Sequence, residues 1–115
     1  MVLELNEYIR TKGGIIAKVI GVQSGGIEKY YFDKEVIDNF KELTQIGAEN
    51  VVLKHSFNII DLIEEGDFIN SVLVTQSYLD NIKYLAKEIV KNNYGIKSIV
   101  TKEQFKAMEY VIREG

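Results

Sequence analysis

The sequence predicts a small α+β protein in which a bent antiparallel sheet of about five strands, an SH3-like and partly closed barrel, is covered by two or three helices. Three observations support this class. β-Branched runs separated by paired glycines come first, apolar residues at three- and four-residue spacing follow, and a helix-capping sequence stands near the C-terminus. Because the chain has 115 residues, we expect a single domain over residues 1–115.

The N-terminal part predicts a meander of three strands joined by two tight turns. We expect these strands at Leu5–Thr11, Ile15–Gln23 and Ile27–Phe32. The turns are Lys12-Gly13-Gly14 and Ser24-Gly25-Gly26, because glycine adopts the positive φ angles that hairpins need. Alternation along the third strand separates Tyr31 from Tyr30 and Phe32. We expect these rings in the core, and base stacking on an exposed sheet is the alternative.

A helical period follows the meander. The apolar residues at this spacing are Val36, Ile37, Phe40, Leu43 and Ile46. With Asp33 as a cap and Gly47 as the end, they predict a helix that begins at Lys34. The β-branched residues within Glu49–Lys54 predict a strand after this helix.

The central stretch, Lys54–Asn70, combines the only histidine with a dense run of apolar and acidic residues. Periodicity does not decide whether Asn58–Glu65 forms one or two helical turns or a buried strand. Gly66 followed by Asp67 predicts a tight turn, and Asp67–Thr75 has the composition of a strand.

The segment Gln76–Asn93 carries apolar residues at helical spacing behind Ser77, a candidate cap. We expect a helix here, and a hairpin that turns at Asp80-Asn81 is the alternative. In either case Gly95 ends the element, and Ile96–Val100 predicts a short strand.

A capping box predicts the last helix. Thr101-Lys102-Glu103-Gln104 places a glutamine three residues after a threonine, where its side chain can accept a hydrogen bond from the Thr101 amide. The helical spacing that follows leads us to expect Phe105, Met108 and either Val111 or Ile112 to face the core.

The composition argues against several classes of function. Seventeen acidic and fourteen basic side chains give a net charge of −3, so we do not expect nucleic acid as a direct ligand. The absence of cysteine excludes disulfides, thiolate zinc sites and cysteine nucleophiles, and it agrees with a cytoplasmic location. No apolar segment approaches the roughly 18 residues of a membrane span, so no membrane contact is expected.

Two groups of residues in the central stretch have simple explanations. His55 lies beside Ser56, but adjacent residues rarely face each other and no third orienting group accompanies them, so we expect a local or capping role. The nearby carboxylates are Asp61, Glu64, Glu65 and Asp67. Their spacing matches no calcium loop, which favours a solvated edge or a negatively charged contact face over a metal site. We predict no catalytic, cofactor-binding or metal-binding residues.

Three stretches of the chain stand out as motifs: LNEYIRTKGGIIAKV, HSFNIIDLIEEGDFIN and IKSIVTKEQFKAMEY. In this order they resemble a family of small, mostly uncharacterised proteins carried by phages, prophages and related mobile elements of Gram-positive bacteria. The resemblance transfers no catalytic residues. The segments least similar to the family are Lys34–Gly47 and Gln76–Tyr94. An activity specific to this protein is expected to reside in these segments.

The resemblance implies a non-enzymatic phage accessory protein that binds another protein in the cytoplasm of the bacterial host, such as an anti-CRISPR-like inhibitor of a host defence system. The partner would be a defence nuclease complex whose basic groove receives an acidic surface with aromatic anchors. The residues expected at this contact are Phe57, Asp61, Glu64, Glu65, Asp67 and Phe68. Reversing Glu64 and Glu65 to lysine is expected to weaken binding and to leave the fold intact.

Two other classes remain as alternatives. One is a module that binds nucleic acid or a nucleotide, and the other is a structural or assembly protein of the phage particle. The sequence leaves open the identity of the target, the binding of any small ligand and the oligomeric state, for which a homo-oligomer is one of the expectations.

Overall fold

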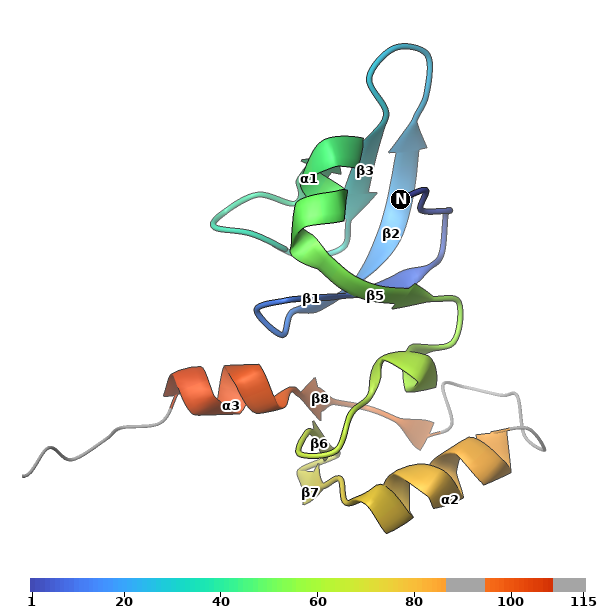
Figure 1. Cartoon of the computed structure of the whole chain (residues 1–115), viewed down its shortest axis with the longest axis vertical. Helices are drawn as coiled ribbons and strands as arrows, with labels where there is room; N and C mark the ends of the chain where they lie inside the picture. Colours follow the sequence, from blue (N-terminus) through green and yellow to red (C-terminus); the bar gives the residue numbers. More distant parts are fainter. Residues whose placement is uncertain (87–94, 109–115) are drawn as a thin grey trace, which may run out of the picture.

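A computed structural model describes residues 1–86 and 95–108 and shows an α+β fold with two antiparallel sheets (Figure 1). In these residues the larger sheet has five strands in the order β4-β3-β2-β1-β5, and the smaller has three in the order β7-β6-β8. The strands of the larger sheet are β1 (Tyr8–Thr11), β2 (Ile16–Gln23), β3 (Lys29–Phe32), β4 (Glu42–Thr44) and β5 (Val52–Ser56). Those of the smaller sheet are β6 (Phe68–Ile69), β7 (Val72–Leu73) and β8 (Ile99–Val100).

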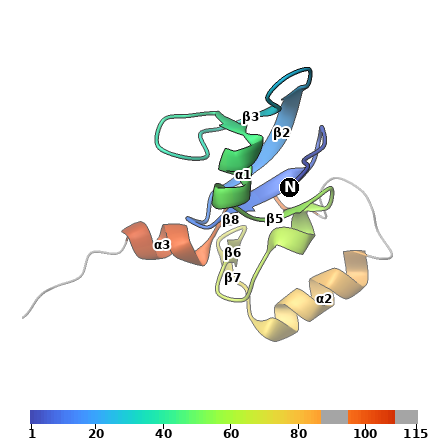
Figure 2. The same ribbon diagram turned by 45° about the horizontal axis from the view of Figure 1, so that its top comes forward.

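Three α-helices and one 3₁₀ helix complete the described part of the chain. They are α1 (Gln45–Val51), α2 (Gln76–Ala86), α3 (Lys102–Met108) and the 3₁₀ helix η1 (Ile59–Leu62). Figures 1 and 2 place α1 on the larger sheet, whereas α2 and α3 lie with η1 and the smaller sheet in the other half of the molecule.

The predicted α+β class and the N-terminal meander are confirmed. β1 pairs with β2 and β2 with β3, both antiparallel, as the two glycine turns require. Gly14, Gly25 and Gly26 all have positive φ angles, which residues with a Cβ rarely adopt. Tyr30 and Phe32 are buried in the core, as expected, whereas Tyr31 is only partly buried.

The expected SH3-like closure is not found, because neither sheet closes or curls into a barrel in residues 1–86 and 95–108. β4 and β5 lie at opposite edges of the larger sheet and pair only with their inner neighbours. None of the helices in the described ranges has the length and apolarity that crossing a bilayer requires.

The predicted helix between Asp33 and Gly47 is wrong. Residues 33–41 form a loop, β4 follows, and α1 begins only at Gln45. The reason is cross-strand pairing: Leu43 lies opposite Tyr30 of β3 and is buried there, and this contact outweighs the helical spacing of its neighbours. Asp33 caps no helix, since its Oδ1 accepts a hydrogen bond from the Lys18 amide at 2.9 Å.

The helix in this part of the chain is α1, which begins at Gln45 and not at Lys34 because Thr44 is its N-cap. The Thr44 hydroxyl accepts a hydrogen bond from the Gly47 amide at 3.1 Å, so Gly47 stands in the first turn instead of ending a helix. α1 extends to Val51, and the strand expected from Glu49 therefore starts at Val52.

The central stretch adopts the helical alternative, with η1 at Ile59–Leu62. The turn predicted at Gly66 and Asp67 is confirmed, since Gly66 has a φ of 95° and the Asp67 amide donates to the Glu64 carbonyl. Asp67–Thr75 is not one strand but a hairpin of β6 and β7. Asn70 and Ser71, with φ angles of 48° and 67°, turn the chain between them.

The helix expected from Gln76 is confirmed over α2 and excludes a hairpin there, while residues 87–93 lie outside the described residues. Thr75, and not Ser77, is the cap, because its Oγ1 accepts a hydrogen bond from the Tyr78 amide at 3.2 Å.

The capping box of α3 is confirmed. The Thr101 amide donates to Gln104 Oε1 at 3.2 Å, and the Gln104 amide donates back to Thr101 Oγ1 at 3.3 Å. The expectation that Phe105 and Met108 face the core is wrong, since they are 54% and 78% exposed. Val111 and Ile112 lie outside the described residues.

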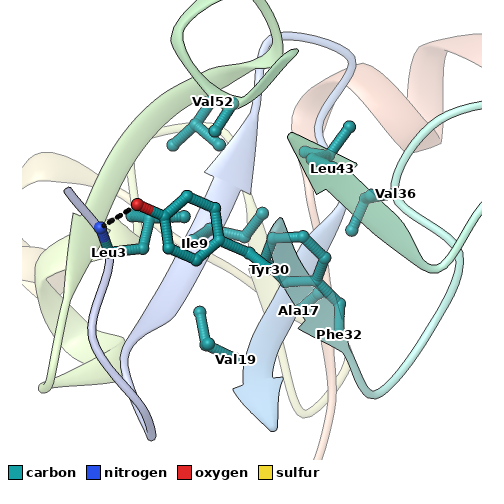
Figure 3. Packing of buried hydrophobic residues seen from close by; sticks show 10 residues of the cluster. Leu3, Ile9, Ala17, Val19, Tyr30, Phe32, Val36, Leu43 and Val52 are labelled. Carbon is teal, nitrogen blue, oxygen red and sulfur yellow. Dashed lines mark hydrogen bonds between the residues drawn. The ribbon is translucent and has the colours of Figure 1, made fainter. Parts of the chain in front are cut away.

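Two hydrophobic clusters hold the fold together. The first lies between α1 and the larger sheet and contains Leu3, Ile9, Ala17, Val19, Tyr30, Phe32, Val36, Leu43, Ala48 and Val52 (Figure 3). The Leu3 amide donates to the Tyr30 hydroxyl at 3.3 Å and so ties the N-terminal segment to this cluster. The second cluster packs the smaller sheet against η1 and α2 and contains Ile60, Ile63, Ile69, Val74 and Leu79.

Two alanine substitutions test whether residues 42–44 form β4, as observed, or part of the predicted helix. Leu43→Ala should lower the free energy of unfolding by about 2–5 kcal/mol, because Leu43 is buried in the first cluster. Ile46→Ala should change it by less than about 0.5 kcal/mol, since Ile46 is exposed on α1. Urea unfolding followed by circular dichroism measures both values, and equal losses would contradict the observed register.

Candidate functional site

Arg10 lies in β1 on the face of the larger sheet opposite the first hydrophobic cluster. Its neighbour Ile9 pairs with Ala17 and joins that cluster, while Arg10 pairs with Ile16 and points the other way, because side chains alternate along a strand. The Arg10 side chain is 0% exposed. A buried guanidinium is stable only with charged and hydrogen-bonding partners, so the chain must supply them in the interior.

The partners of Arg10 come from three segments of the other half of the molecule. Its two terminal nitrogens donate to the Asp67 carboxylate at 2.5 and 3.0 Å, in the paired geometry that arginine forms best with a carboxylate. One of these nitrogens also donates to Glu103 Oε2 at 2.7 Å, and the other donates to the Leu62 carbonyl at 2.9 Å. Arg10 thus joins the larger sheet to η1, the turn before β6, and α3.

Asp67 is as deeply buried as Arg10 and is surrounded by donors. Besides the guanidinium, its carboxylate accepts hydrogen bonds from the amides of Glu64 at 2.7 Å and Lys102 at 2.9 Å. The Gly66-Asp67 turn and the first turn of α3 therefore share one carboxylate. Asp67 has no exposed surface and is unavailable to a partner in this fold.

Glu64 occupies the border of the same cluster. Lys54 Nζ and Lys102 Nζ lie 2.8 and 2.7 Å from its carboxylate, and Arg10 Nε lies at 3.8 Å. Partial burial raises the pKa of Glu64, but the hydrogen bonds from both lysines and the charge of Arg10 outweigh it and lower the pKa to about 2.

The charges of this cluster cancel. Burial lowers the pKa of Arg10. The hydrogen bond to Asp67 and the charges of Asp67, Glu64 and Glu103 raise it by more, so the pKa of Arg10 lies above its ordinary value. Three cations, Arg10, Lys54 and Lys102, thus meet three carboxylates. We call these six residues the Arg10 network. Glu64 and Asp67 therefore do not form the uncompensated negative surface that was expected, because Arg10 and Lys102, from distant parts of the sequence, and Lys54, from the same central stretch, balance their charges.

The remaining acids expected at a contact face, Asp61 and Glu65, are exposed. Asp61 accepts a hydrogen bond from the Ser56 hydroxyl at 2.6 Å, and the same hydroxyl accepts from the Asn58 amide at 3.0 Å. Phe57, at the end of β5, is also exposed. Their role in partner binding stays a prediction.

His55 and Ser56 do not form a nucleophile and base pair. His55 Nδ1 lies 2.8 Å from Glu7 Oε1, and Ser56 bonds to Asp61 instead. The Glu7 carboxylate also accepts from the Glu4 amide at 2.7 Å, so the histidine supports a turn before β1, in line with the local role expected for it. In the described ranges no group of three or more His, Asp or Glu side chains is arranged to hold a metal ion.

Phe68 belongs to an exposed apolar surface on the smaller sheet. In the centre of that sheet it lies directly opposite Leu73 of β7 and Val100 of β8, so the three side chains form a row on one face. The Phe105 ring of α3 packs on Phe68 with a centroid separation of 4.9 Å and an interplanar angle of 35°. With Met108, one turn further along α3, these residues form what we call the small-sheet face.

Sequence reasoning missed both the Arg10 network and most of the small-sheet face. The sequence carries no local signal for the network, because the Arg10 partners Asp67 and Glu103 lie 57 and 93 residues away. Of the residues predicted to bind a partner, the structure places Phe68 on the small-sheet face and Glu64 and Asp67 in the Arg10 network.

Comparison of the chain with protein-family models, with curated proteins and with solved structures finds no match in any of the three.

Removing the buried cation should strongly destabilise the fold. Arg10→Met keeps much of the side-chain volume but leaves the buried Asp67 carboxylate without its counter-charge, so we expect a loss of about 3–5 kcal/mol in urea unfolding. Lys29→Met is the matched control, because Lys29 forms an exposed pair with Glu42 at 3.6 Å and should cost less than about 1 kcal/mol. A loss for Arg10→Met as small as for the control would contradict the network.

Acid should weaken the network through Glu64. Because its pKa is lowered from 4.5 to about 2, its contribution to stability is fully present above the unfolded value and is lost as the pH falls from 4.5 toward 2. Glu64→Gln should therefore show a shallower loss of stability over this pH range in urea unfolding. Glu65→Gln, an exposed neighbour, should follow the wild type, and identical profiles for all three proteins would refute the role of Glu64.

The same contacts revise the charge reversal expected from the sequence. Glu64→Lys would place a third cation beside Lys54 and Lys102 and should destabilise the fold, so it does not isolate a binding effect. Glu65→Lys, on an exposed residue, is the substitution that tests the predicted acidic contact.

Proposed function

We propose that this protein is a non-enzymatic protein-binding module that docks on its partner through the small-sheet face. The observation that carries the proposal is the convergence of apolar side chains from β6, β7, β8 and α3 on one exposed surface outside both hydrophobic clusters. Exposed apolar surfaces of this kind in small proteins mark sites of contact with other macromolecules.

The chemistry of the face fits a protein contact. Two aromatic rings in tilted contact, Phe68 and Phe105, form its centre. The aliphatic side chains of Leu73 and Met108 are 50% and 78% exposed. Aromatic residues and methionine are enriched at the centres of protein interfaces. The aromatic rings bury a large area with few rotatable bonds, and the flexible methionine adapts to the shape of its partner. This composition favours a protein partner over a nucleic acid.

The position of the face next to the Arg10 network also supports the proposal. Asp67 precedes Phe68, and Glu103 stands two residues before Phe105, so the network fixes the backbone that carries both rings. A surface whose backbone is already fixed loses little conformational freedom when it binds. The ionisable groups of the Arg10 network, which lies behind the face, are paired with one another, and this supports a binding role over a catalytic one.

The resemblance to phage and prophage proteins supplies the class of partner. We propose that the module acts in the cytoplasm of a Gram-positive host as an anti-CRISPR-like inhibitor, with a defence nuclease complex as its target. The exposed acids Asp61 and Glu65 would add a charge-complementary contact to a basic groove, and Phe57 would add an apolar one.

An affinity capture experiment tests the face. The tagged wild type should retain a defence complex from a Gram-positive host lysate, identified by mass spectrometry, and Leu73→Glu should reduce retention at least roughly tenfold, because a charge replaces a central apolar contact. Ile27→Glu is the matched control, since Ile27 is exposed in the turn between β2 and β3, and it should retain the complex. Equal retention by both variants, with circular dichroism confirming that both are folded, would refute the face as the binding site.

A further inference from the structure

We infer that the small-sheet face binds the same face of a second copy of the chain, so that α3 of each copy packs on β7-β6-β8 of the other. This inference rests on the proposed function, because it assigns a second occupant to the surface that we propose as a protein-binding site, so that a second copy and the bacterial target compete for the face. The arrangement is a twofold dimer, in which one patch on each copy contacts the identical patch on its partner.

The shape of α3 fits this role. Its hydrogen bonds to the rest of the described chain come from its start: Thr101 Oγ1 donates to the Gly14 carbonyl at 2.7 Å, the Lys102 amide donates to Asp67, and Arg10 donates to Glu103. None of the side chains from Lys102 to Met108 is buried, and the helix projects away from the body of the molecule (Figure 1). The exposed side chains of α3 are therefore available for contact with a second copy of the chain.

The small-sheet face includes the helix α3 and a row of strand residues that is wide enough to accommodate α3 of a second copy. The row Leu73, Phe68 and Val100 crosses three strands and is about 10 Å wide, which is close to the diameter of a helix with its side chains. Phe105 of the same copy already covers Phe68, so Leu73 and Val100 are the open positions. Across a twofold axis, Phe105 and Met108 of each copy meet these positions on the other.

The exposed apolar area of the small-sheet face is about as large as the central apolar part of a small dimer interface. The five side chains expose on the order of 400 Å² in each copy, if a complete aromatic side chain offers about 150–250 Å² and the aliphatic ones somewhat less. A stable interface buries about 800 Å² from each partner, of which the central half is largely apolar. With a polar rim around this centre, we expect a dimer with a dissociation constant in roughly the micromolar range.

Charges at the border of the face are complementary. Lys106, in the last turn of α3, is exposed and forms no ion pair with any residue in the described ranges. Glu65 is also exposed and precedes Gly66, whose amide donates to the Val74 carbonyl beside Leu73. When α3 of one copy lies over β7 of the other, Lys106 approaches Glu65, and this contact offsets the repulsion between two chains that each carry a net charge of −3.

Sedimentation equilibrium of the purified full chain over a range from about 1 to 500 µM tests the inference. The wild type should form dimers, and Leu73→Glu should weaken dimerisation at least roughly tenfold, while the control Ile27→Glu should leave it unchanged. Lys106→Glu and Glu65→Lys should each weaken the dimer, and the double variant should recover part of the loss. Circular dichroism establishes that each variant is folded.

Three results would overturn the inference: a wild type that stays monomeric over the whole range, dimers that Leu73→Glu leaves unchanged, or charge variants whose effects add without recovery. A monomeric wild type that still captures a bacterial target through Leu73 would overturn the dimer and leave the proposed function standing. A dimer that depends on Leu73 without capture of any target would support this inference and remove the defence complex as the partner.

Discussion

A guanidinium with no contact to solvent needs its charge compensated inside the protein, and three segments of this chain meet to compensate Arg10. Asp67 supplies two of its hydrogen bonds, Glu103 supplies another and Leu62 offers a carbonyl. These groups belong to the half of the molecule built on the second hydrophobic cluster, while Arg10 belongs to the sheet that carries the first. The two halves therefore have one electrostatically fixed position relative to each other, because any separation leaves buried charges unpaired.

The network and the small-sheet face depend on the same backbone. Successive residues of an extended chain point to opposite sides, so Asp67 points toward Arg10 while Phe68 points outward. In the first turn of α3, Glu103 and Phe105 likewise lie on opposite sides of the helix, with Glu103 facing Arg10 and Phe105 facing Phe68. One side of this backbone is thus committed to charge compensation and the other presents apolar side chains. The exposed rings owe their fixed position to the buried ion pairs behind them, which favours binding with little rearrangement.

Local signals in the sequence predicted local structure well. The glycine turns of the meander, the capping box at Thr101 and the helix over α2 needed only neighbouring residues. The prediction of a helix from Lys34 was wrong because Leu43 fits both the helical spacing of its neighbours and a position in a strand. Its pairing with Tyr30 of β3, which lies outside the predicted helix, favours the strand. The ion pairs of Arg10 could not be predicted, since no residue near it in sequence takes part, and without them the acids of the central stretch looked like an uncompensated negative surface.

The bond between the Thr101 hydroxyl and the Gly14 carbonyl spans 87 residues, and Glu103 reaches Arg10 across 93. Contacts of such separation form late, because closing a long loop costs chain entropy before it brings any gain. During synthesis the N-terminal meander emerges from the ribosome long before its C-terminal partners exist. The nascent chain must keep Arg10 hydrated until Glu103 has been synthesised, so the buried ion pairs of the N-terminal meander form only after α3 has emerged.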